Sequence, residues 1–180
     1  MMESGQYSIP LTGLKEGSHI YEFEIDSDFF AGFEGSEIGA GELSAVVTLV
    51  KRSSHMELEM ALRGSVEVEC DRCLEPYMQR VETKGRLLIK DGNQWEEVDD
   101  EVLIIPHGES QLDLSQLIYE FAHLGLPIKR LHPEDDEGYS GCDPDMLERI
   151  DGFTDDDREG DEKYDPRWSD LGKLKEDLLN

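Results

Sequence analysis

The sequence has few cations for its length. Its 180 residues include 17 Lys and Arg against 43 Asp and Glu, which gives a formal net charge of -26. A charge of this sign repels nucleic acid and anionic membranes at long range. Any polyanion partner must therefore contact a local exception to the overall charge, whereas basic proteins suit the rest of the surface.

Long hydrophobic runs are also absent. No run approaches the ~18 apolar residues that span a bilayer, and the first six residues lack the charged-then-apolar pattern of a signal peptide. These absences predict a cytoplasmic protein without membrane contact. With 37% hydrophobic residues, the chain can bury one sizeable core and carry a polar appendage.

Cysteine is scarce, but two of the three cysteines form Cys70-Asp71-Arg72-Cys73 between two strand-like segments. Three cysteines cannot all pair within one chain, and a reducing compartment disfavours stable disulfides. Two thiols at a hairpin tip can chelate a soft cation, form a redox couple or simply pack. The choice depends on the other residues that reach the turn.

Alternating side chains predict strands over much of the first half. Apolar and polar residues alternate around Tyr21–Ile25, Met56–Leu62, Val66–Glu69 and Val81–Ile89, and a short strand is expected at Val102–Ile105. Between Leu43 and Val50 both parities are apolar, so we expect that strand to be covered on both faces. Short strands joined by short turns predict a curved, mainly antiparallel sheet. The aromatic cluster at 28–33 is expected to form a short helix or plug that fills the core.

The second half changes to helical periodicity and then to an acidic tail. Leu114, Leu117, Ile118 and Phe121 form an apolar stripe after Asp113, which predicts a helix at 113–125. Residues 134–165 contain fifteen Asp or Glu against three Lys or Arg, and a run of this charge resists collapse. The prediction is one α+β domain: a β-rich core at 1–131, a mobile acidic loop at 132–164, and a helix at 165–180 that docks on the core or on a partner protein.

Zinc is the candidate ligand of the cysteine turn. A thioredoxin-like redox pair begins a helix, whereas strand alternation follows this pair, and no base or oxyanion donor accompanies a nucleophilic cysteine. A closed zinc site needs four ligands. Cys70 and Cys73 supply two, and His132 with Cys142 complete a set of three thiolates and one imidazole, with His107 as a competing ligand. The alternative is a reduced pair packed under the turn.

The least acidic part of the chain surrounds the same turn. Residues 51–90 carry eight Lys or Arg and seven Asp or Glu, a net charge of +1. Arg80, Lys84 and Arg86 share the parity of one strand face, with Arg72 at the tip, so this face can hold phosphates. Alternatively, ordinary pairs with Glu67, Glu69 and Glu82 neutralise it.

Three segments together resemble the YceD family, the large ribosomal RNA subunit accumulation proteins of bacteria and plastids. They are the strand and turn at 64–75, the helix at 113–120 with its Gly125-Leu126-Pro127 end, and the closing Asp165-Pro166-Arg167-Trp168. The family's Cys-x-Arg-Cys signature falls on Cys70, Arg72 and Cys73. Many relatives carry further cysteine pairs after the helix, where this chain has only His132 and Cys142.

The resemblance implies a non-enzymatic factor needed for the synthesis, processing or stability of large-subunit ribosomal RNA. Its expected partners are that RNA or its precursor, basic ribosomal proteins, or assembly proteins, with no small-molecule substrate. A second hypothesis is a protein-interaction module for another assembly factor without RNA contact. A thiol redox or metal-dependent enzyme is the third hypothesis, disfavoured because no catalytic constellation accompanies the thiols.

Overall fold

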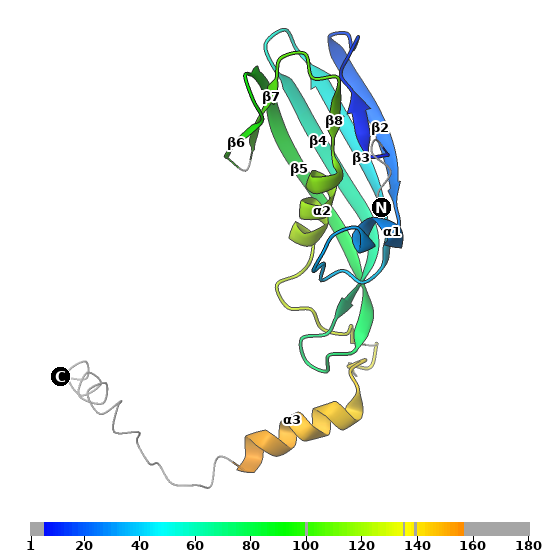
Figure 1. The fold of residues 1–180 in the computed structure, drawn as a ribbon. Helices are drawn as coiled ribbons and strands as arrows, with labels where there is room; N and C mark the ends of the chain where they lie inside the picture. Colours follow the sequence, from blue (N-terminus) through cyan, green and yellow to red (C-terminus); the bar gives the residue numbers. More distant parts are fainter. Residues whose placement is uncertain (1–5, 100, 135, 139, 157–180) are drawn as a thin grey trace, which may run out of the picture. The chain divides into compact units, whose positions relative to one another are not determined.

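A six-stranded sheet is the largest element of the computed structural model, which describes residues 6–99, 101–134, 136–138 and 140–156 (Figure 1). The sheet confirms the predicted α+β class: β2 to β5 pair antiparallel with their sequence neighbours, β7 joins β5 in parallel, and β6 pairs antiparallel with β7. In spatial order its strands are β2 (Gly17–Ile25), β3 (Gly41–Lys51), β4 (Met56–Glu69), β5 (Pro76–Gly92), β7 (Val102–Pro106) and β6 (Glu96–Asp99).

One face of this sheet, here called the covered face, packs against the other elements of the first 141 residues (Figure 1). These are the helices α1 (Ser27–Ala31) and α2 (Ser115–Leu124) and the two-stranded pair of β1 (Ser8–Pro10) with β8 (Gln111–Asp113). The largest fully buried side chains form the core between these layers: Ile9, Ile25, Phe29, Phe30, Leu43, Leu49, Leu58, Met60, Leu62, Ile89, Ile105 and Leu112. The period-2 pattern thus puts the apolar parity of each strand in the core.

The opposite side, the open face, carries the alternate residues of the same strands. Glu22, Val46, Ala61 and Lys84 are cross-strand neighbours on β2 to β5 and mark this face. Val46 is 41% exposed, so the expectation that β3 is covered on both faces is wrong. Small β-branched residues suit a pleated surface whether or not it is covered, and their presence alone does not indicate a second layer.

An aspartate carboxylate accepts a backbone hydrogen bond near the start of each described helix of the first unit. Asp26 caps α1 by accepting a hydrogen bond from the Phe29 amide (3.2 Å), and Phe29 and Phe30 are buried, which confirms the predicted short helix and core filling. Asp113 accepts a bond from the Ser115 amide at the start of α2 (2.8 Å), although Asp113 itself ends β8. Compared with the predicted helix at 113–125, α2 therefore begins two residues later and ends one residue earlier.

The chain divides into two compact units, Met1–Gly141 and Cys142–Asn180. In the second unit, α3 (Pro144–Asp156) lies within the predicted acidic loop, so that prediction is wrong for these residues. Pro144 suits a first helical turn, and the Asp143 carboxylate accepts a bond from the Asp145 amide (3.0 Å). The rest of the predicted loop beyond 156 and the predicted helix at 165–180 lie outside the described residues. None of the described helices combines the length and the apolarity needed to cross a bilayer.

Candidate functional site

The cysteine turn joins the two longest strands, β4 and β5, at one end of the sheet. Two backbone hydrogen bonds close it: the Cys70 amide donates to the Glu75 carbonyl (3.0 Å) and the Leu74 amide to the Cys70 carbonyl (2.9 Å). Leu74 adopts a positive φ of 63°, a conformation that is uncommon for side chains larger than Asn. The tight turn places Cys70 and Cys73 in the buried interior, at 0% and 2% exposure.

The structure brings together all four predicted metal ligands. The donor atoms of Cys70, Cys73, His132 and Cys142 lie within 4.8 Å of one another. Cys142 is the first residue of the second unit. The Cys73 thiol and the His132 Nδ1 atom are 3.4 Å apart. His107, the competing ligand, follows the last residue of β7, and its amide donates to the carbonyl of Gly92, the last residue of β5 (3.0 Å).

The donor set fits zinc. Three cysteines and one histidine are a common set for closed structural zinc sites. A tetrahedral ion about 2.3 Å from each sulfur separates the sulfurs by about 3.8 Å, so small side-chain movements close the cluster around an ion. No disulfide joins the three cysteines.

Hydrogen bonds favour the thiolate form of Cys70. Burial raises the pKa of this thiol, but donors outweigh it and lower the pKa to about 6: the backbone amides of Cys73, Arg72 and His132, and the His132 side chain. The thiolate is the form that binds metal. A low pKa also suits redox chemistry, but the pair precedes strand β5 and so lacks the helix N-terminus that activates thioredoxin-type thiols.

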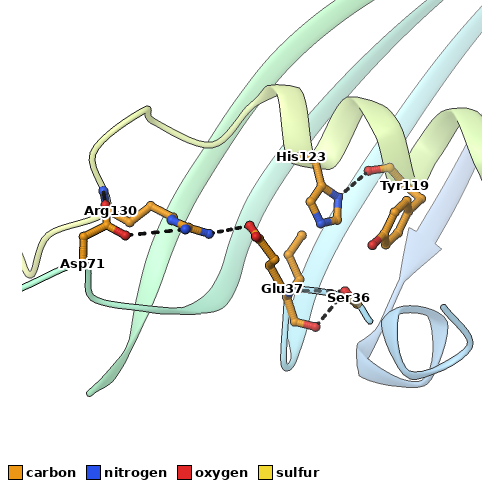
Figure 2. Close-up of polar contacts among 7 residues, drawn as sticks. Ser36, Glu37, Asp71, Tyr119, His123 and Arg130 are labelled. Atoms are coloured by element: carbon orange, nitrogen blue, oxygen red, sulfur yellow. Dashed lines mark hydrogen bonds and ion pairs between the residues drawn. The ribbon is translucent and has the colours of Figure 1, made fainter. Parts of the chain in front are cut away.

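Arg130 holds the returning chain against the cysteine turn. Its amide donates to the Asp71 carboxylate (2.7 Å), and the Asp71 amide donates to the Arg130 carbonyl (2.7 Å). Figure 2 shows its guanidinium between two acids, 2.7 Å from Glu37 and 3.5 Å from Asp71. These contacts place His132, two residues further along, beside the thiols.

The predicted basic residues divide into a group of three and one separate residue. Arg80, Lys84 and Arg86 are exposed on the open face of β5, whereas Arg72 is exposed in the turn. Arg80 shares Glu82 with Arg63, at 3.7 and 3.1 Å. Within the described part of the chain, no ion pair engages Lys84 or Arg86.

The alternative, in which Glu67, Glu69 and Glu82 neutralise the basic residues, is confirmed only for Glu82. Glu82 fills that role, but Glu67 and Glu69 lie opposite Met78 and Pro76, nearer the turn than any of the three β5 cations. Both acids line a hollow of about 680 Å³ beside the turn, together with Glu37, Asp71 and Arg130. The hollow next to the cysteines is therefore mostly acidic, and the predicted basic residues other than Arg72 lie further along β5.

Comparison with known families identifies the chain. A family model described as large ribosomal RNA subunit accumulation protein YceD matches residues 58–175, which is more than half of the chain. The chain belongs to the YceD family. Searches of curated proteins and of solved structures found no match.

The YceD match begins in β4 and includes the cysteine turn, β5, α2 and both distal ligands, whereas β1 to β3 precede it. It therefore covers every residue of the candidate metal cluster and all four predicted basic residues. Sequence reasoning missed Arg130, Asp71 and Glu37. A cation two residues before His132, at the start of a strongly acidic stretch, was the available sign that this segment contacts an acid elsewhere.

Proposed function

We propose that this YceD-family protein is a non-enzymatic accessory factor in ribosome biogenesis, acting in the cytoplasm. It supports the synthesis, processing or stability of large-subunit ribosomal RNA. Membership of the YceD family supports a role in the accumulation of large-subunit ribosomal RNA. RNA contact is supported by three exposed cations on the open face of β5, two of which form no ion pair among the described residues.

In this proposal the β5 face approaches RNA phosphates and the cysteine turn has a structural role. The acids around the turn repel phosphate, whereas Arg80, Lys84 and Arg86 project from the same face of one strand, with Glu82 between Arg80 and Lys84. The net charge of -26 limits nonspecific RNA binding. It also favours basic ribosomal or assembly proteins as further partners. The same acidic hollow supports the alternative of a protein-interaction module without RNA contact.

Zinc is the proposed ligand of Cys70, Cys73, His132 and Cys142. Bound there, it would supply a structural cross-link between the hairpin turn and the chain that follows α2. The β-sheet core has its own apolar packing, so the ion would order the turn end of the molecule and leave the main fold to the sheet.

Neutralising the basic residues is expected to weaken RNA binding and its salt dependence. We expect an Arg72→Gln, Arg80→Gln, Lys84→Gln, Arg86→Gln variant to reduce the magnitude of the slope of log K against log salt by about 2, because each of the three lost β5 contacts removes roughly 0.7 to 0.9. Filter binding of a large-subunit ribosomal RNA precursor transcript across a salt series measures this slope.

The matched control replaces four cations outside the β5 face by glutamine: Lys15, Lys51, Arg52 and Arg149. It makes the same change in net charge, so it should keep most of the slope. If the salt slope fell equally in the two variants, the change in net charge alone would explain the result. Wild-type RNA binding and ribosomal RNA accumulation in the first variant would defeat direct contact and leave the protein-interaction alternative.

Asp71→Ala is expected to weaken zinc binding about 10- to 100-fold, the usual range for groups that position ligands. The substitution removes the carboxylate that holds the Arg130 amide and guanidinium, so His132 loses its support. Competition with a chromophoric chelator measures the affinity. Glu75→Ala, in the same turn, is the control, because the Glu75 contact with Cys70 uses only its backbone carbonyl. Unchanged affinity in Asp71→Ala would rule out this positioning role.

A further inference from the structure

The two edges of the six-stranded sheet differ in length and regularity. β6 ends one edge with four residues, and its register shifts between Glu97 and Asp99. β2 ends the other with nine residues in uninterrupted register with β3. Proteins usually blunt an edge with short strands, bulges, proline or lysine. β6 has such protection, whereas β2 contains neither proline nor lysine and has no bulge.

The backbone of β2 has donors and acceptors directed away from β3. In an antiparallel pair, alternate residues direct their N–H and C=O groups to the far side. Among the described residues, no backbone hydrogen bond joins β2 to any strand other than β3. An added strand would satisfy these groups by the mode that peptide-binding sheets use.

The side chains of β2 specify which strand would fit. On the open face, Glu22 and Glu24 are exposed and Ile20 is 66% exposed. On the covered face, Tyr21 and Phe23 are half-buried. No cation in the described ranges pairs with Glu22 or Glu24. The β2 edge thus has two carboxylates without an ion pair on its open face and two half-buried aromatic side chains on its covered face.

We propose that the β2 edge binds an extended basic segment of a partner protein as a seventh strand of the sheet. Lysine or arginine side chains at alternate positions would lie beside Glu22 and Glu24, and apolar side chains between them would extend the layer of Tyr21 and Phe23. Nucleic acid lacks the peptide groups for this pairing, and the glutamates repel it. A second copy carries the same glutamates and a net charge of -26. The inference holds whether or not β5 contacts RNA.

The test uses the full-length protein and two labelled synthetic peptides of nine residues, the length of β2. One alternates lysine with valine, and the other has the same side chains with alternate backbone nitrogens methylated. We expect fluorescence anisotropy to detect binding of the first peptide only. Hydrogen exchange should show new protection of amides in β2. Binding of both peptides to the same extent would overturn strand addition, as would binding of neither.

Charge reversal tests the acidic side of the edge. Glu22→Lys with Glu24→Lys should weaken binding of the lysine–valine peptide roughly thirtyfold, because two favourable cross-strand pairs become unfavourable. The control, Glu42→Lys with Glu59→Lys, makes the same charge change on the open face of β3 and β4, which are flanked on both sides. It should stay within about threefold of wild type. Equal weakening in both variants, or none in the first, would overturn the proposal and leave the glutamates as protection against edge-to-edge aggregation.

Discussion

Replacing Cys70 and Cys73 by serine is expected to remove zinc from the purified protein and to loosen the turn end of the molecule. The wild type, purified without chelator, should carry about one equivalent of zinc, and the variant less than about a tenth, because two of four ligands are lost. Structural zinc sites contribute about 10 to 16 kcal/mol of apparent binding free energy in small peptides. Elemental analysis measures the metal, and hydrogen exchange measures protection around the turn.

The loss should be local. The sheet buries its apolar residues without help from the cluster, so exchange in β3 and the central part of β4 should change little. His107→Ala is the matched control, because His107 lies away from the four donors and should leave the zinc content unchanged. If the wild type carried less than about a tenth of an equivalent of zinc, the metal proposal would be wrong, and a reduced Cys70–Cys73 pair packed under the turn would be favoured.

Gly64→Ala is expected to destabilise the sheet by about 3 kcal/mol or more, through backbone strain together with overpacking. Gly64 lies in β4 with a φ of +154°, and a Cβ atom there would lie 2.1 Å from the Glu42 carbonyl oxygen and 2.9 Å from the Leu43 Cα atom. Both are backbone atoms of β3, so relief requires the strands to separate. Urea unfolding followed by circular dichroism measures the change.

Gly39→Ala provides the comparison within the same unit. A Cβ atom at Gly39 meets only the end of the Glu67 side chain, at 3.0 Å, which can rotate away. We therefore expect a change within about 0.5 kcal/mol, as for most surface substitutions. If the two variants unfolded at the same urea concentration, the close approach of β3 and β4 at Gly64 would not exist in solution.

Local pattern was enough to predict most of the sheet. The alternation in β4 and β5 places Leu58, Met60 and Val81 in the core as expected, and Phe29 with Phe30 fills it. Periodicity indicates which residues face the core but not which strand pairs with which, so the parallel pairing of β5 with β7 was not predictable. Strands of three residues, such as β1 and β8, are too short to show a period.

The metal ligands of the candidate site were predictable because they follow from residue type alone. Cysteine and histidine are rare here, so the ligand set could be chosen by elimination. The Asp71–Arg130 contact could not, because it depends on where the chain returns after α2, and acids and cations are common. The helix α3 was not predicted because the acidic charge of the segment indicates a loop, whereas the local signals at Asp143 and Pro144 indicate a helix start.

The strand order also has a consequence for folding during synthesis. β2 to β5 pair with their sequence neighbours, so each hairpin can close as soon as its second strand has been made, at little entropic cost. The pairing of Ser8 with Asp113 must wait until β8 emerges. α1 can cover part of the apolar side early, but the part that β8 and α2 cover stays exposed to water until they are translated. This interval is when a chaperone would bind, and when premature termination would leave an aggregation-prone product.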